Sequence, residues 1–158
     1  MSLRFAILGS GSRGNALLLE TANVRVLLDC GFAAREVEAR LSQLAIDPTT
    51  LTAILVTHEH GDHIRGVGAM ARRYQLPVWM TPGTFHSVSY GSLPDLQLID
   101  SHAGPFSIGD LSVLPYPVPH DSREPCQFVF TSAKHRLGGI DRCWPYNAPY
   151  QSNPKGLR

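Results

Sequence analysis

Short apolar segments separated by turn residues dominate the first thirty positions of the chain. Apolar runs cover residues 3–8, 16–20 and 24–29, and a turn rich in glycine and serine covers residues 9–15. Short apolar runs between turn residues are typical of β-strands. The segment therefore predicts three strands connected as a meander.

The following segments alternate between helical and strand patterns. Apolar residues recur with helical spacing over 34–44 and again over 64–74. Between these two predicted helices, residues 51–57 form a nearly continuous apolar and β-branched run, which is typical of a strand covered on both faces. Shorter apolar runs predict further strands over 77–81, 108–115 and 127–131. The mixture predicts an α/β (α+β) fold.

Composition narrows the class of protein. The chain has 158 residues, 43% of them hydrophobic and 17% charged, with a net charge of +1. A single domain of this length buries about two-thirds of its unfolded surface. The composition excludes a coiled coil, a disordered chain and a collagen-like chain. The near-neutral charge gives no general electrostatic argument for nucleic acid or an anionic membrane, although a local basic patch stays open.

Cysteine usage and hydropathy bear on the cellular compartment. The chain has three cysteines, Cys30, Cys126 and Cys143, and no CxxC pair. This pattern favours a reducing cytosol over a disulfide scaffold. No apolar stretch approaches the roughly 18 to 20 residues that a membrane-spanning helix requires. We therefore expect a cytoplasmic protein that makes no membrane contact.

The strongest chemical signal follows the predicted strand 51–57. Here His58, His60, Asp62 and His63 fall within six residues. Imidazole nitrogens and carboxylate oxygens are ligands for zinc and similar divalent ions. Gly61 allows a turn between the first two histidines and the Asp62–His63 pair, so the spacing suits two neighbouring metal ions.

Residues 57–63 resemble the HxHxDH signature of the metallo-β-lactamase fold superfamily. Asp29, at the end of an apolar run, resembles the first acidic motif of that family, and His120 resembles its next ligand histidine. Together with the turn at 10–15, the order resembles the YycJ/WalJ-like branch of cytosolic phosphodiesterases or exonucleases. The resemblance covers about residues 3–138 and implies an αββα sandwich.

The same resemblance implies a catalytic site with two divalent metal ions, zinc or manganese. They would activate a hydroxide for attack on a phosphodiester. The resemblance implies that His58, His60 and His120 bind the first metal. It implies that Asp62 and His63 bind the second. Asp62 would also orient the attacking hydroxide. Asp29 would support the site by accepting a hydrogen bond from a ligand imidazole or by fixing the loop.

A competing motif lies in the first turn. Gly9, Gly11 and Gly14 spell GxGxxG after a predicted strand, and Asp29 lies near the distance at which a dinucleotide-binding fold places its ribose-binding acid. That fold needs a helix after the third glycine, and residues 15–23 leave too little room for one. The dinucleotide alternative is therefore disfavoured.

We expect the turn at 10–15 to line the active site instead. Its backbone amides, with Ser10, Ser12 and Asn15, would bind a phosphate oxygen. The alternative is that the segment is only a tight turn between two strands.

Beyond residue 138 the sequence departs from the family pattern. A relative would continue into an apolar-TD-GH segment whose aspartate bridges both metals, whereas residues 139–158 are rich in Pro, Asn, Tyr and Ser. We expect residues 1–138 to form the N-terminal part of the domain and 139–158 to be an aberrant, disordered tail. Permitted codons for this tail, read in a shifted frame, spell ALTDVGHITPHI, which indicates a frameshift near Gly138 or Gly139. Sequencing the coding DNA tests this hypothesis.

These observations favour a metal-dependent hydrolase that acts on nucleic acid or a small phosphodiester. The same metal chemistry would also serve a thioester or lactam substrate. A catalytically dead metal-binding fragment is the third alternative, because without the bridging aspartate the second metal would keep only Asp62 and His63. We then expect weak binding at the second position and low activity. The oligomeric state stays open.

Overall fold

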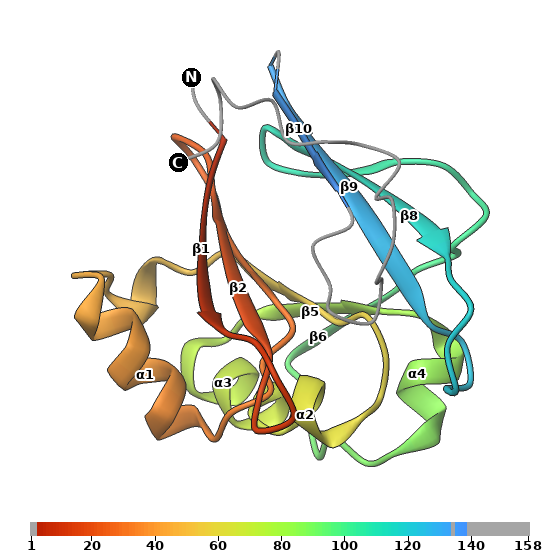
Figure 1. Ribbon diagram of the computed structural model, residues 1–158, viewed down its shortest axis with the longest axis horizontal. Coiled ribbons are helices and arrows are strands. Elements are labelled where there is room, and N and C mark those ends of the chain that lie inside the picture. Colours follow the sequence, from red (N-terminus) through yellow and green to blue (C-terminus); the bar gives the residue numbers. More distant parts are fainter. Residues whose placement is uncertain (1–2, 134, 139–158) are drawn as a thin grey trace.

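The computed structural model describes residues 3–133 and 135–138, which form two β-sheets and a layer of helices (Figure 1). The expectations for 139–158, including the aberrant tail and the frameshift, lie outside the described residues. The first sheet contains β1 (Arg4–Gly9), β2 (Ala16–Glu20), β3 (Arg25–Leu28), β4 (Ala53–Leu55), β5 (Pro77–Met80) and β6 (Asp95–Leu98), in that order. Its first three strands are antiparallel, and β3 to β6 are parallel.

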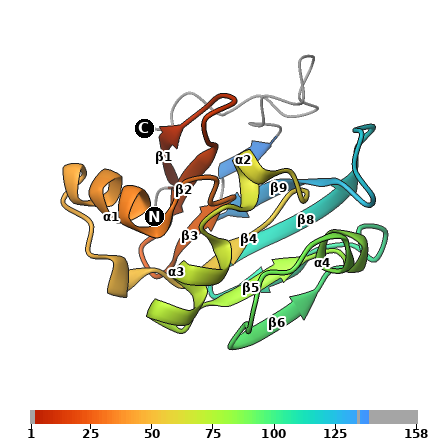
Figure 2. The same cartoon turned by 90° about the horizontal axis from the view of Figure 1, so that it is seen from below.

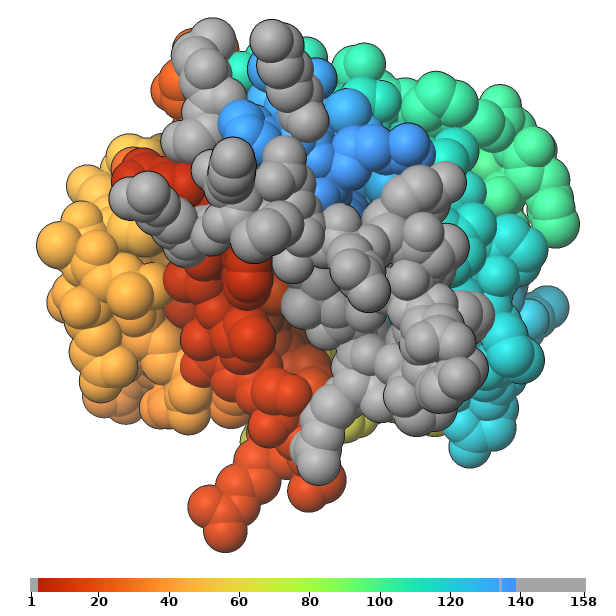
Figure 3. Space-filling model, turned by 45° about the horizontal axis from the view of Figure 1, so that its top comes forward, coloured from red at the N-terminus to blue at the C-terminus, as the bar shows by residue number. Residues whose placement is uncertain are grey.

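The second sheet is antiparallel throughout. It contains β7 (Phe106–Ile108), β8 (Leu111–Pro117), β9 (Cys126–Ser132) and β10 (His135–Gly138), in the order β10-β9-β8-β7. The helices are α1 (Ala34–Gln43), α2 (Gly61–Ile64), α3 (Val67–Tyr74) and α4 (Pro82–Ser87), with a short 3₁₀ turn η1 (Pro48–Thr50). Figure 2 shows α1 and α3 on the outer face of the first sheet, and Figure 3 shows α1 (orange) beside β1 (red). One helical layer and both sheets of the expected sandwich are thus present.

Two hydrophobic cores hold these layers together. Successive side chains of a strand point to opposite faces of the sheet, and β2 follows this rule with three leucines. Leu18 packs into the core shared with the helices, whereas Leu17 and Leu19 pack into the core between the two sheets. The helical core includes Val37 and Leu41, which are four residues apart on α1 and fully buried. The first sheet is therefore covered on both faces, as predicted for its central strand.

The structure corrects two of the predicted elements. The helix predicted for 64–74 begins only at Val67, and a separate turn, α2, precedes it. The break lies at Gly66, where a Cβ atom would be 2.1 Å from the carbonyl oxygen of Phe32. The strand predicted for 108–115 is divided between β7 and β8, because Gly109 has a φ of +56° and turns the chain.

Candidate metal centre

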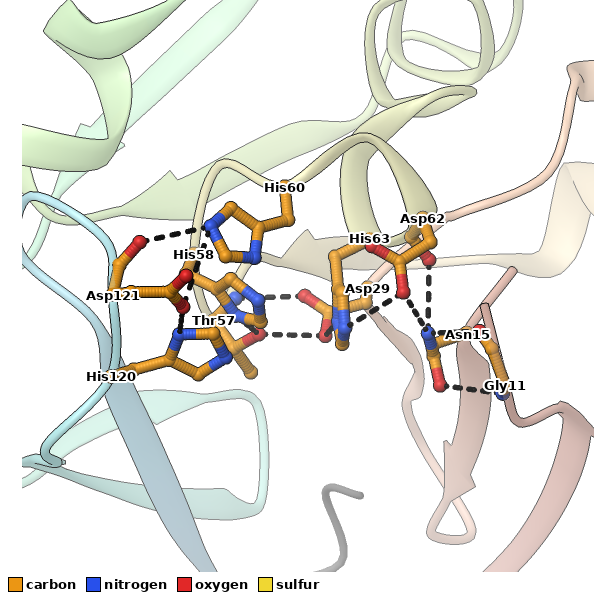
Figure 4. Close-up of polar contacts among 10 residues, drawn as sticks. All are labelled: Gly11, Asn15, Asp29, Thr57, His58, His60, Asp62, His63, His120 and Asp121. Atoms are coloured by element: carbon orange, nitrogen blue, oxygen red, sulfur yellow. Dashed lines mark hydrogen bonds and ion pairs between the residues drawn. The ribbon is translucent and has the colours of Figure 1, made fainter. Parts of the chain in front are cut away.

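The candidate ligands gather at the carboxyl ends of neighbouring parallel strands. Asp29 follows β3, and the segment from Thr57 to His63 follows β4. Because β3 and β4 are parallel, their carboxyl ends lie at the same edge of the sheet. His120 comes from the loop between β8 and β9, so the second sheet also contributes (Figure 4).

Three of the predicted ligands form a compact cluster of imidazoles. One ring nitrogen from each of His58, His60 and His120 lies within 4.8 Å of the others. Their ring centroids are 4.3 to 4.9 Å apart. His63 lies against the same cluster, with its centroid 4.1 Å from that of His58. The three side chains are thus close enough together to bind a single metal ion.

The hydrogen bonds of His58 leave one nitrogen free for a metal. Its Nδ1 lies 2.9 Å from the Thr57 hydroxyl, and that hydroxyl lies 2.7 Å from Asp29 Oδ2. The carboxylate can only accept, so the hydroxyl donates to Asp29 and accepts from His58 Nδ1–H. His58 Nε2 is then unprotonated, and it is buried without a hydrogen-bond partner among the described residues. An orphaned lone pair of this kind fits a bound metal ion.

Asp121 contacts the other two imidazoles of the cluster. Its backbone carbonyl lies 3.1 Å from His60 Nε2, and because a carbonyl only accepts, that nitrogen donates and His60 Nδ1 is left free. Its carboxylate oxygen Oδ1 lies 2.7 Å from His120 Nδ1 as an ion-pair contact, without the geometry of a hydrogen bond. In the rings of His58 and His60, one nitrogen has a hydrogen-bond partner and the other is available as a ligand.

Asp29 organises the buried side of the site. Its side chain accepts hydrogen bonds from the Thr57 backbone N–H (2.8 Å), the Thr57 hydroxyl (2.7 Å) and His63 Nδ1 (2.6 Å). The residue is 3% exposed and has a φ of +60°, in the left-handed region that aspartate tolerates better than most residues. Asp29 therefore orients His63 directly and His58 through Thr57.

Asp62 joins the glycine-containing turn to the site. Its carboxylate oxygen Oδ2 lies 3.7 Å from His63 Nε2 and accepts a hydrogen bond from the Asn15 side-chain amide at 3.0 Å. The Asn15 carboxamide also bonds the backbone N–H of Gly11 at 3.0 Å. Ser12 lines a cavity that also contains Asp62, whereas Ser10 lines a neighbouring cavity. Phosphate binding by Ser10, Ser12 and Asn15 stays a prediction.

The glycines of the GxGxxG motif make room for an aromatic ring. A Cβ atom on Gly9 or Gly14 would lie 2.2 Å or 2.5 Å from the ring of Phe32. The segment after Gly14 is strand β2, without the helix that a dinucleotide-binding fold needs. The dinucleotide alternative is therefore wrong, and the motif reflects packing.

A family model, "Metallo-beta-lactamase superfamily", matches residues 9–134, most of the chain. The chain belongs to the metallo-β-lactamase superfamily. Members of this superfamily bind divalent metals, commonly zinc, and the histidine cluster of this chain lies within the matched residues.

Two relatives within this superfamily are exodeoxyribonucleases. Exodeoxyribonuclease YycJ from Bacillus anthracis is 36% identical over 143 residues, which are 89% of this chain and 54% of the relative. Exodeoxyribonuclease WalJ from Streptococcus pneumoniae serotype 2 (strain D39) is 32% identical over 135 residues, 82% of this chain and 50% of the relative. The chain thus spans about half the length of these relatives.

Solved structures support the same metallo-β-lactamase fold. The metallo-β-lactamase fold protein YhfI from Bacillus subtilis superposes with a TM-score of 0.71 at 18% identity, covering 87% of this chain and 62% of that protein. The Rm3 metallo-β-lactamase gives a TM-score of 0.68 at 18% identity, covering 94% of this chain and 64% of that protein. At such identities the similarity concerns the fold alone.

The electrostatics of the metallo-β-lactamase centre favour a neutral His58. Burial and, to a smaller extent, the neighbouring His63, His120 and His60 together lower the pKa of His58 from 6.5 to about 3. A metal ligand must be unprotonated. His58 is therefore ready to bind a metal across the neutral pH range.

Sequence reasoning missed three residues that support this centre. Thr57 relays the hydrogen bond between His58 and Asp29, and Asp121 contacts two imidazoles. Glu59 accepts a hydrogen bond from the backbone N–H of Arg123 at 2.9 Å and so fastens the loop that carries His120. Asp121 could have been recognised because it directly follows the predicted ligand His120 in the sequence. The role of Glu59 depends on the approach of two distant loops.

Replacing Asp121 with alanine is expected to weaken zinc binding about 10-fold, at the lower end of the effect of such supporting residues. The carboxylate beside His120 is lost, whereas the backbone carbonyl at His60 remains. Because the Asp121 side chain is 89% exposed, stability to urea should not change. Competition with a chromophoric chelator measures the zinc affinity, with Asp95→Ala as the control on a distant exposed aspartate. Equal zinc affinities in the Asp121→Ala and wild-type chains would contradict the assignment.

Proposed function

We propose that the chain carries the metal centre of a hydrolase that cleaves phosphodiester bonds in nucleic acid. The observation that carries the proposal is the cluster of His58, His60 and His120, in which one ring nitrogen of each lies within 4.8 Å of the others. The similarity to two exodeoxyribonucleases supports nucleic acid as the substrate class.

Some residues of the proposed site would bind metal ions, and others would orient the ligands or the attacking water. His58, His60 and His120 would hold a first divalent ion, zinc or manganese, and Asp62 with His63 would hold a second. Bound ions of this kind lower the pKa of a water and stabilise charge on phosphoryl oxygens. Asp62 Oδ2 accepts a hydrogen bond from Asn15, which leaves Oδ1 to orient the attacking water. Asp29 would keep His63 in one tautomer by accepting from its Nδ1.

We further propose a cytoplasmic location. The two cysteines in the described part of the chain, Cys30 and Cys126, are free and buried. Burial raises the pKa of the Cys30 thiol to about 12 and that of the Cys126 thiol still further, so neither would form a reactive thiolate. Among the described residues, no helix has the length and apolar character to span a membrane.

Hydrolysis of a chromogenic phosphodiester tests the proposed function. The chain, loaded with zinc or manganese, is expected to hydrolyse bis(p-nitrophenyl) phosphate and to shorten a labelled single-stranded oligonucleotide. Parallel reactions contain a thioester and a β-lactam. Turnover of the thioester or the lactam without turnover of either phosphodiester would overturn the proposal. Metal binding without turnover of any substrate would do so too, in favour of a catalytically inactive metal-binding fragment.

A further inference from the structure

A cavity of about 430 Å³ opens beside Asp62. Its lining includes Arg13 from the turn between β1 and β2, Arg65 after α2, and Arg72 on α3. Asp62 is the single acidic residue of this lining. We call this space the arginine cavity. Its volume falls within the range of about 300 to 1,000 Å³ that is usual for ligand sites, and it shares Asp62 with the metal centre.

The wall of the arginine cavity around Arg72 is fixed by hydrogen bonds. The Arg72 guanidinium donates from Nη1 to the carbonyl oxygens of Tyr90 and Ser92, at 2.9 Å each. Gly68 and Gly91 leave space for it, because Cβ atoms there would lie 3.0 Å and 2.8 Å from Nη1. The positive charge of Arg72 is therefore held in place on one side of the cavity.

The other two arginines are available to a ligand. Arg13 and Arg65 are exposed, and neither has an ion pair within the part of the chain that the structure describes. By contrast, Arg73 on the same helix as Arg72 pairs with Glu38. A guanidinium without a carboxylate partner binds a phosphate through two parallel hydrogen bonds. Arg13 and Arg65 thus offer two phosphate contacts close to Asp62.

Positive charge continues from the arginine cavity along the turn between β1 and β2, which lies next to α2 in Figure 1. A second cavity of about 360 Å³ shares Ser12 and Arg13 with the first and adds Arg40, whose guanidinium pairs with Glu36. The two linings together hold four of the fourteen basic residues and one of the thirteen acidic residues of the chain. In a chain with a net charge of +1, this is a local basic track that leads to Asp62.

We propose that the arginine cavity binds the sugar–phosphate backbone of a single nucleic acid strand, with Arg13 and Arg65 on phosphates beside the one that is cleaved. This inference rests on the proposed function and makes it more specific. The two arginines would position the strand on either side of the bond that is cleaved. Val88, 38% exposed and part of the cavity lining, offers an apolar contact to a sugar or base.

The test compares two variants. The double variant carries both Arg13→Gln and Arg65→Gln, and the control variant carries Arg35→Gln alone. Arg35 is an exposed arginine on α1 that lines neither cavity. Binding of a fluorescent single-stranded oligonucleotide is measured by anisotropy over a range of salt concentrations. The double variant is expected to bind at least about 10-fold more weakly, with a salt slope smaller by about 1.4, since each phosphate contact on a single strand contributes about 0.7.

Hydrolysis kinetics separate the failure of this inference from the failure of the proposed function. The double variant should raise KM for the oligonucleotide, whereas Arg35→Gln should leave both this KM and turnover of bis(p-nitrophenyl) phosphate unchanged. An unchanged oligonucleotide affinity and salt slope in the double variant, an equal loss in Arg35→Gln, or no oligonucleotide binding by the wild-type chain would overturn the inference. Oligonucleotide binding that depends on Arg13 and Arg65, without hydrolysis of any phosphodiester, would support the strand site and overturn the proposed function.

Discussion

Replacing His58 with glutamine is expected to remove the tightly bound zinc and to lower phosphodiesterase turnover by more than about 100-fold, beyond the range of a supporting residue. His58 is 1% exposed, and its Nε2 has no hydrogen-bond partner within the part of the chain that the structure describes. A glutamine side chain is of similar size but offers only a neutral amide, which is a poor zinc ligand. Metal content after dialysis, measured by plasma mass spectrometry, and hydrolysis rates check the result.

His86→Gln is the matched control for this variant. His86 is an exposed histidine near the end of α4 and lies outside the cluster. It should retain the zinc and the activity of the wild-type chain. Circular dichroism establishes that both variants are folded. Equal zinc content in the His58→Gln and wild-type chains would refute the assignment of His58 as a ligand.

Replacing Asp29 with asparagine is expected to lower the free energy of unfolding by about 2 to 3 kcal/mol, the usual range for buried hydrogen bonds to a charged group. The carboxylate accepts three hydrogen bonds, and an asparagine would direct an NH₂ group toward at least one of these donors. Asparagine tolerates the positive φ of this position, so the variant tests the carboxylate without adding backbone strain. Urea denaturation measures the stability.

A second measurement on Asp29→Asn distinguishes a positioning role from a purely structural one. If Asp29 orients the imidazoles of His58 and His63, zinc affinity should fall about 10- to 100-fold in the folded variant. Asp95→Asn, at an exposed position on β6, serves as the control. A loss of stability with unchanged zinc affinity would show that Asp29 supports the fold and not the metal centre.

Elements with a clear apolar pattern were predictable from the sequence. The run 16–20 coincides with β2, whose residues are all buried, and the helix predicted for 34–44 ends one residue earlier, at Gln43. Strand β6 was missed, because its four residues, Asp-Leu-Gln-Leu, are exposed or half-buried and their alternation is too short to distinguish a strand from a loop. The start of α3 was misplaced, since the helical spacing continues through Gly66 and only the approach of Phe32 explains the break.

The same distinction applies to the metal centre, where some residues could be predicted from the sequence and others could not. The histidines of residues 58–63 could be recognised because they are adjacent in the sequence and follow a buried strand. The contact between His63 on α2 and Asp29 after β3 joins residues 34 positions apart in the sequence, and only a family resemblance pointed to it. The roles of Glu59 and Asp121 depend on the path of the loop between β8 and β9, which no local pattern describes.

The origin of His120 in that loop has a thermodynamic consequence. His58 and His60 follow the first sheet, and His120 belongs to a connection of the second sheet. A metal ion bound by all three would act as a cross-link between the two sheets, formed only in the folded chain. Folding and metal binding are then linked, and free zinc at 1,000 times its dissociation constant would add about 4 kcal/mol to the stability of the domain. Zinc availability would thereby control how much of the chain is folded.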